Sequence, residues 1–189
     1  KNCVIRRNSA NNFGGGTAGC QLINCALTEN SAYLYGGAAY TGWLLNCTVV
    51  GNTSGGYNNA YGGAVAKTYF TNSIVVSNLV RGPVPTNYYN STSVYSCTFP
   101  LLPGPGNMDI DPQLLPDGIH LSLLSPCRGA GTNLVTGTDI DGQSWANPPP
   151  MGCDEWHPEP FFTRKPDFQF RGFPPQLIMG GGVIAGQEP

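Results

Sequence analysis

The segment Asn46-Cys-Thr-Val-Val-Gly-Asn52 belongs to a repeat that decides the fold. Its Asn-Cys pair, the aliphatic residue two places later and the second asparagine recur at the same offsets in three other segments: Asn2–Asn8, Asn24–Asn30 and Asn72–Asn78, the last with Ser73 in place of cysteine. The four copies begin 22, 22 and 26 residues apart, and a looser copy begins at Ser96, 24 residues further on. Glycine pairs keep the same phase at Gly14-Gly15, Gly36-Gly37 and Gly62-Gly63. Self-similarity at such a period is the signature of a repeat architecture.

Side chains within one repeat alternate between two faces, as in a β-strand. Leu45, Cys47 and Val49 fall on one side, and Asn46 and Thr48 on the other. A period of 22–26 residues suits short stacked strands, whereas helical repeats need about 33 residues or more. We therefore predict an all-β chain, folded as a right-handed parallel β-helix (a solenoid of about five coils) with an irregular C-terminal cap and tail.

Two columns of side chains are expected to run along this helix. The inward column contains one residue from each coil: Cys3, Cys25, Cys47, Ser73 and Cys97. A corner column contains Asn8, Asn30, Asn52 and Asn78, whose amides would donate and accept hydrogen bonds along the stack. The glycine pairs would turn the chain where a Cβ would clash.

The coil region resembles the right-handed parallel β-helix proteins of bacterial surfaces, and within them the repeats of polymorphic outer-membrane proteins. Gly62-Gly-Ala-Val65 matches the turn of that repeat. An aliphatic residue three places before each corner asparagine stands where the family has the phenylalanine of its Phe-x-x-Asn step. The resemblance covers residues 1–100 and implies a secreted or cell-surface protein with a structural or adhesive role.

Residues 107–155 resemble the end module that closes such helices in secreted bacterial multidomain proteins. The matching blocks are Asp109–Gln113, His120–Gly131, Thr138–Gly142 and Met151–Glu155. The resemblance implies a structural module that covers the last coil, which would otherwise expose unpaired strand edges. The expected domains are coils at 1–106, a capping module at 107–155 and a Pro-, Phe- and Gly-rich tail or linker at 156–189.

The amino-acid composition argues against some classes of binding partner. Charged residues make up 11% of the 189-residue chain, and a net charge of −2 without a basic block argues against nucleic acid as a partner. No apolar run reaches the ~18 residues of a membrane-spanning helix. We expect other copies of this chain, or a surface glycan or protein, as partners. Because the chain begins directly on a coil, we interpret it as a mature protein without its leader or as an excised piece.

Acidic residues are scarce in the coils and gather in the end module. Residues 1–108 contain one acid, Glu29, whereas a polysaccharide lyase needs a carboxylate cluster and a glycoside hydrolase needs a carboxylate pair. No catalytic residue and no cofactor is therefore predicted, with Ca²⁺ as the alternative to no cofactor. Zinc is not expected, because the cysteines lack Cys-x2-Cys spacing. Three interpretations of the end module stand. Its Asp side chains cap turns, an acid pair acts beside His120, or a Ca²⁺ site is built from Asp109, Asp111, Asp139 and Asp141.

Cysteines and aromatic residues supply the remaining candidates. Cys127 and Cys153 lie in the irregular module and are expected to form a disulfide, whereas Cys3, Cys25 and Cys47 are expected to be free thiols. Six tyrosines would contact a glycan or a protein, or would only cover the turns: Tyr33, Tyr35, Tyr57, Tyr61, Tyr88 and Tyr89. An assembly segment is expected at Phe168, Phe170 and Phe173, which would pack on the first coil of a neighbouring copy.

Three functions fit these observations. The carboxylate-poor coils favour a non-catalytic extracellular structural or adhesive module. Assembly of such a module into filaments is the second function. The alternative is a fragment of a secreted polysaccharide lyase or glycoside hydrolase whose catalytic coils lie upstream of Lys1, since the fold alone does not choose among them.

Overall fold

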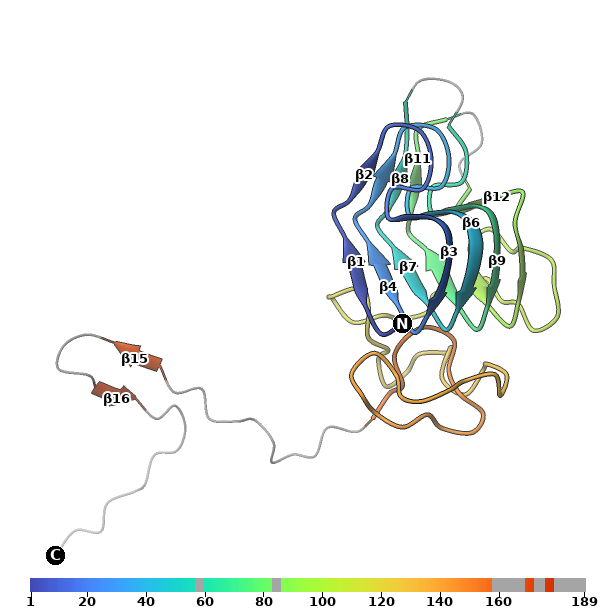
Figure 1. Cartoon of the computed structure of the whole chain (residues 1–189). Helices are drawn as coiled ribbons and strands as arrows, with labels where there is room; N and C mark the ends of the chain where they lie inside the picture. The colour runs from blue at the N-terminus through green and yellow to red at the C-terminus, as the bar shows by residue number, and fades with distance from the viewer. Residues whose placement is uncertain (57–59, 83–85, 158–168, 172–175, 179–189) are drawn as a thin grey trace, which may run out of the picture. The chain divides into compact units, whose positions relative to one another are not determined.

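The chain folds as a parallel β-solenoid of about four turns in a computed structural model (Figure 1). The structure describes residues 1–56, 60–82, 86–157, 169–171 and 176–178, and within these ranges it has strands and turns but no helix. The predicted all-β class and the parallel stacking are confirmed. The expected fifth coil is incomplete, because its first strand is the two-residue β14.

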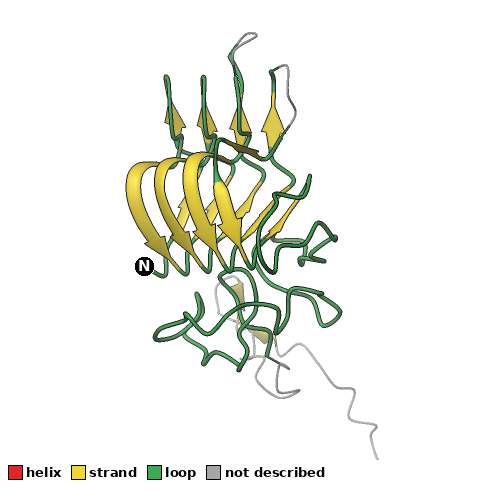
Figure 2. Cartoon of the chain, turned by 90° about the vertical axis from the view of Figure 1, so that its right-hand side faces the viewer, coloured by secondary structure: helices red, strands yellow, loops and turns green. Residues whose placement is uncertain are grey.

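Each turn of the solenoid contributes strands to three parallel sheets, so that the coils lie side by side in Figure 2. The first sheet is formed, in order, by β1 (Val4–Arg6), β4 (Ala26–Thr28), β7 (Thr48–Val50), β10 (Ile74–Val76) and β14 (Cys97–Thr98). The second sheet contains β2 (Ser9–Ala10), β5 (Ser31–Ala32), β8 (Thr53–Ser54) and β11 (Leu79–Val80). The third contains β3 (Thr17–Ile23), β6 (Ala39–Leu45), β9 (Val65–Thr71), β12 (Tyr88–Tyr89) and β13 (Thr92–Val94).

The core lies inside the coils and is built by residues that stack in register. Leu27, Val49 and Val75 pair along the first sheet and are each fully buried. Leu44 and Phe70 stack opposite them from the third sheet. Complete burial of an aliphatic or aromatic side chain of this size stabilises the fold by about 1.5–3 kcal/mol. Cys47 and Val49 face the interior as predicted, but Leu44 and not the predicted Leu45 is in the core, because the left-handed Asn46 interrupts the alternation between β6 and β7.

The corner column of asparagines is a continuous amide ladder. Asn30 Oδ1 accepts the backbone N–H and the side-chain amide of Asn8, both at 3.0 Å. Asn52 and Asn78 continue the same double contact at 2.8–3.0 Å. Asn87 ends the column by accepting from Asn78 at 3.0 and 2.8 Å, a role that the repeat register did not reveal. Each buried amide thus finds its partner in the next coil.

The predicted inward column is wrong at its last member. Ile74 pairs with Cys97, so the final step is 23 residues and Ser96 occupies the inward place. The hydroxyl of Ser96 accepts the N–H of Ser73 at 3.1 Å, as the hydroxyl of Ser73 accepts the N–H of Cys47 at 3.1 Å. Cys97 therefore faces outward. The sequence prediction aligned Cys97 with the earlier cysteines and so placed the last repeat one residue out of register. The inward position is defined by the hydroxyl that accepts a backbone N–H of the preceding coil, and Ser73 and Ser96 both make this hydrogen bond.

Residues 107–155 reach the end of the coils through their first residues, and their later residues lie against the outer face of the first sheet. The end is covered by the segment 99–108, in which Leu102 packs against the inner core and Met108 forms a bridge with Cys97. The residues that follow lie beneath the strands in Figure 1, in yellow to orange. There Leu121 and Met151 pack against the outward-facing side chain of Ile74. The module therefore meets β14 through Met108 and Ile110, and its later residues bury the outer face of the first sheet.

Residues Lys1–Trp156 form one compact unit and His157–Pro189 a second. In the second unit, the described residues are two short antiparallel strands, β15 (Gln169–Arg171) and β16 (Gln176–Ile178). Phe170 pairs with Leu177 in their register. Phe168 and Phe173 lie outside the described residues, so the predicted assembly segment stays a prediction.

Candidate functional site

A second column of asparagines fastens the module to the coils. Asn2, Asn24, Asn46 and Asn72 open the four repeats, and each has a left-handed backbone, with φ between 48° and 53°. Asparagine tolerates this conformation better than most residues. Their side-chain amides donate to carbonyl oxygens of the module, at Asp139, Thr138, Pro150 and Thr132 respectively, over 2.6–3.3 Å. The sequence showed that these asparagines recur in each repeat, but nothing in it indicated that their side chains bind the module.

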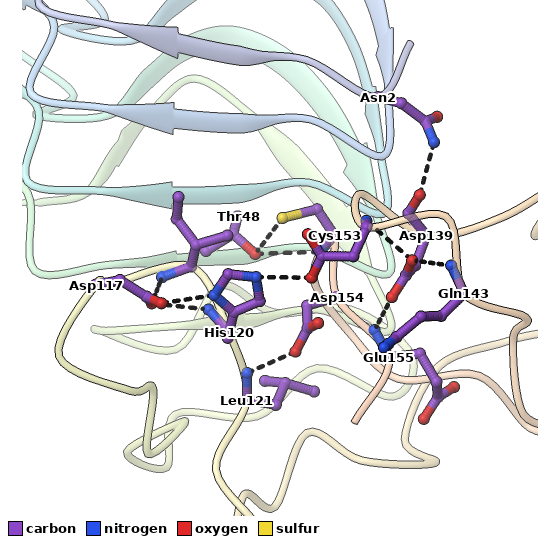
Figure 3. Close-up of polar contacts among 12 residues, drawn as sticks. Asn2, Thr48, Asp117, His120, Leu121, Asp139, Gln143, Cys153, Asp154 and Glu155 are labelled. Atoms are coloured by element: carbon purple, nitrogen blue, oxygen red, sulfur yellow. Dashed lines mark hydrogen bonds and ion pairs between the residues drawn. The ribbon is translucent and has the colours of Figure 1, made fainter. Parts of the chain in front are cut away.

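His120 lies at the centre of a polar cluster where three segments of the module meet (Figure 3). Its Nδ1 is 2.6 Å from Asp117 Oδ2, and its Nε2 is 2.8 Å from Asp141 Oδ2. One ligand atom each of His120, Asp141 and Asp154 lie within 4.8 Å of one another. Acids of the module thus do lie beside His120, as one interpretation of the sequence proposed, and the structure identifies them as Asp117, Asp141 and Asp154.

The pKa values of His120 and its neighbouring carboxyl groups depend on one another. Burial would lower the pKa of His120, but its hydrogen bond with Asp117 and the nearby carboxylates outweigh burial and raise that pKa above its usual range. Burial raises the pKa of Asp154 to about 6. For Asp117, the hydrogen bonds from His120 and the backbone overcome burial and lower the pKa. The neighbouring carboxylates therefore favour the protonated form of the His120 imidazole.

The four predicted Ca²⁺ ligands do not come together among the described residues. Asp139 is fully buried and accepts three backbone N–H groups, from Asp141, Gln143 and Glu155, at 2.7–3.0 Å. Asp111 accepts the N–H of Gln113 at 2.9 Å, as a turn cap does. These two acids are occupied by structural hydrogen bonds, while Asp141 belongs to the His120 cluster.

Cys127 and Cys153 are free thiols, in place of the expected disulfide. The Cys153 thiol lies 3.3 Å from Thr48 Oγ1 on β7, and burial raises its pKa to about 12. Cys127 packs in the cluster that contains Cys97 and Leu121. The two side chains face different coils, which the sequence could not show. Cys25 and Cys47 are buried and free, whereas Cys3 is exposed and free.

A cleft of about 670 Å³ runs between the outer surface of β10 and β11 and the segment 109–118. Val50, Val76 and Leu114 give it an apolar floor, and Asp109 and Asp111 supply its carboxylates. Asp111 already caps a turn, and the histidine of the module does not line the cleft. The cleft therefore lacks the two free facing carboxylates that glycoside hydrolysis uses.

Aromatic side chains form a continuous stack where the chain enters the third sheet. Phe13, Tyr35 and Tyr61 stack in successive coils with ring centroids 5.5 and 5.7 Å apart, and Tyr89 follows Tyr61 at 4.6 Å. Of the predicted tyrosines, Tyr35, Tyr61 and Tyr89 thus come together. Tyr88 is half-buried and donates its hydroxyl to Leu101 O at 3.1 Å, Tyr33 is exposed, and Tyr57 lies outside the described residues.

Trp43 and Tyr69 form a further neighbouring pair, besides the six tyrosines singled out from the sequence. They pair in register on β6 and β9, with centroids 5.8 Å apart. Their exposed fractions are 62% and 58%. In the sequence, each of the two rings lies three residues before the asparagine that opens a repeat. This equivalent position in the repeat could have identified the pair.

Comparison with family models, with curated proteins and with solved structures gives no match for this chain. Within the described part of the chain, no helix has the length and apolar character needed to cross a membrane.

Proposed function

We propose that the protein is a non-catalytic module of the cell surface or the secreted space that binds a glycan through the outer face of its third sheet. The observation that carries the proposal is the adjacent, solvent-exposed pair of Trp43 and Tyr69. Rings that remain more than half exposed next to one another are costly to keep in water and form an adhesive surface.

The character of this surface favours a glycan over a charged partner. Lys67, whose ammonium lies 5.7 Å from the centre of the Tyr40 ring, is a neighbouring charge on the same sheet. The stacked tyrosines add phenolic hydroxyls, which donate and accept hydrogen bonds. Since strands of adjacent coils lie ~4.8 Å apart, the rings recur along the solenoid at short intervals. A polymer of neutral, hydroxylated units has the repetitive chemistry that such a surface matches.

The electrostatics of the coils support a binding role without hydrolysis. Glu29 is the one acid among residues 1–108, and it is paired with Arg6 and Arg7 on the first-sheet side of the coils. Within the described coils, the third sheet consequently has no carboxylate beside its aromatic residues to act as an acid or a base. Assembly into filaments would be an additional property of the tail and is independent of this surface.

Binding to a panel of neutral and acidic polysaccharides by affinity electrophoresis tests the proposal. We expect retardation on at least one neutral polysaccharide, weakened at least tenfold in Trp43→Ala and in Tyr69→Ala because exposed aromatics are the usual hot spots of recognition. Leu79→Ala, which removes an exposed apolar side chain from the second sheet, is the control. Unaltered binding by Trp43→Ala, or binding of proteins alone, would refute the proposal.

A further inference from the structure

The orientation of His120 is fixed by a carboxylate that is itself held in place. Asp117 Oδ1 accepts the backbone N–H groups of Ile119 and His120 at 2.8 and 3.1 Å. Its Oδ2 accepts Nδ1–H of the ring at 2.6 Å. The other ring nitrogen, Nε2, therefore points away from Asp117 toward Asp141 and Asp154 (Figure 3). A carboxylate that holds one ring nitrogen so that the other faces outward is the usual support of a metal-binding histidine.

Asp154 is a buried carboxylate with unused capacity. The residue is 4% exposed. Its Oδ2 accepts the N–H of Leu121 at 2.7 Å, and among the described residues it has no other hydrogen-bond donor. Burying a carboxylate is costly unless its oxygens are paired or bind a cation. The buried carboxylate therefore favours a positive charge at this place, which the protonated His120 supplies in the metal-free protein and which a bound cation would supply in its stead.

We propose that His120 Nε2, Asp141 and Asp154 bind a divalent transition-metal ion of the zinc type, with Asp117 as the residue that positions the imidazole. Ligand atoms at bond lengths of about 2.0–2.2 Å in a tetrahedral site lie roughly 3.3 Å apart. The present atoms, all within 4.8 Å of one another, reach that arrangement through small side-chain movements. A nitrogen and two carboxylate oxygens suit zinc, whereas Ca²⁺ requires six to eight oxygen ligands.

Binding of the metal ion releases one proton from the site. The contact between Nε2 and Asp141 Oδ2 at 2.8 Å is a shared hydrogen in the metal-free protein. The ion takes the nitrogen lone pair and the carboxylate oxygens, and that proton leaves to solvent. The fourth position falls to water on the open side of the site, because the side chains of His120 and Asp141 are 32% and 47% exposed.

The ion would join three segments of the module and fix them on the coils. His120 and Asp141 belong to separate loops, and Asp154 follows Cys153, whose N–H donates to Thr48 Oγ1 of β7 at 3.1 Å. A ligand that binds the folded state and not the unfolded chain stabilises the fold. The site is therefore a structural staple between the module and the first sheet, and it does not depend on glycan binding by the third sheet.

Thermal unfolding of the full chain with ZnCl₂ after chelator dialysis tests the assignment. The exposed thiols are first replaced by Cys3→Ser and Cys20→Ser, because thiolates also bind zinc. We expect the Tm to rise by about 5–10 °C at a hundredfold excess over Kd, and CaCl₂ or MgCl₂ to have no comparable effect. The rise should be lost in His120→Gln and in Asp141→Asn, and kept in Asp109→Asn, an acid of the same module outside the cluster.

A spectroscopic readout separates binding from folding. Co²⁺ bound in a tetrahedral nitrogen–oxygen site should give visible d–d absorption in the parent protein and none in His120→Gln. Asp117→Asn should still bind Co²⁺ but 10- to 100-fold more weakly, since it loses only the orienting carboxylate. No rise in Tm with zinc, a rise that persists in His120→Gln, or a response to Ca²⁺ in place of zinc would each overturn the proposal.

Discussion

Asn24 and Thr138 are 114 residues apart in the chain, yet the side-chain amide of Asn24 donates to the carbonyl of Thr138 at 2.7 Å. The same kind of contact recurs at each opening asparagine, so residues 132–150 of the module are docked along the side of the solenoid. A repeat that looks purely internal to the coils thus presents a row of amide donors to a partner segment. The periodicity of the coils sets the spacing of these donors.

The docking column predicts a large effect of substituting Asn72. This buried side chain donates to Thr132 O at 2.7 Å and accepts Thr132 N–H at 2.8 Å, and its φ is 48°. Asn72→Ala loses both bonds, together with a third from the amide to Asn46 Oδ1 at 3.3 Å, and leaves alanine in the left-handed region. The change should lower the free energy of unfolding by about 2–4 kcal/mol. Asn72→Gly, which loses the bonds but not the backbone freedom, should be about 1 kcal/mol less destabilised. Urea unfolding measures both, and equal stability of the two variants would contradict this account of the backbone.

The amide ladder predicts a contrast between its middle and its end. Asn52 is fully buried and donates to Leu27 O at 2.9 Å and to Asn78 Oδ1 at 2.9 Å. Asn52→Asp places a carboxylate against these acceptors and should cost about 3–5 kcal/mol of unfolding free energy. Asn8→Asp makes the same change at the exposed end of the column and should cost less than about 1 kcal/mol. Similar losses of unfolding free energy in the two variants would show that burial of an amide does not determine its contribution to stability.

Periodicity predicted the coils and the Asn8 column because both depend on contacts between equivalent residues of adjacent repeats. It did not predict where the module lies, since that depends on pairs such as Asn24 and Thr138, which share no repeat position. One signal was nevertheless available. Ile74-Val-Val76 is apolar on both faces of its strand, whereas the equivalent β1 ends in Arg6. A strand that is apolar on both faces is covered on both faces, as Ile74 and Val76 are.

Thiol accessibility predicts a simple labelling pattern. Cys3 and Cys20 are exposed, and the remaining five cysteines are buried and free. In the folded, unreduced protein, iodoacetamide should alkylate the two exposed thiols quickly, and the other five only after unfolding. Peptide mass spectrometry without reduction gives the count. A Cys127–Cys153 cross-linked peptide in that digest would restore the disulfide that the sequence predicted and would show that this part of the module rearranges on oxidation.

Glu29 predicts a pH dependence of stability with a defined sign. The hydrogen bonds and charges of Arg6 and Arg7 lower its pKa from 4.5 to about 2. Because the folded-state pKa lies below the ordinary value, the stabilisation is fully present above about pH 4.5 and is lost as the pH falls toward 2. Glu29→Gln keeps the length of the side chain and the left-handed φ of 56°, so it removes only the charge. The Tm of the wild type should exceed that of Glu29→Gln at pH 7, and the difference should disappear by about pH 2.

The salt dependence of the difference in Tm between wild type and Glu29→Gln is a second test of the Glu29 ion pairs. The Glu29 side chain is 43% exposed, so solvent screens its ion pairs and the difference in Tm at pH 7 should be small. In 1 M NaCl, where the Debye length falls to about 3 Å, that difference should shrink further. Arg7→Gln, which removes one of the two cations, should reproduce part of the loss and shift the pKa of Glu29 upward. A difference between wild type and Glu29→Gln that is constant from pH 7 to pH 2 would show that Glu29 acts through packing and not through its charge.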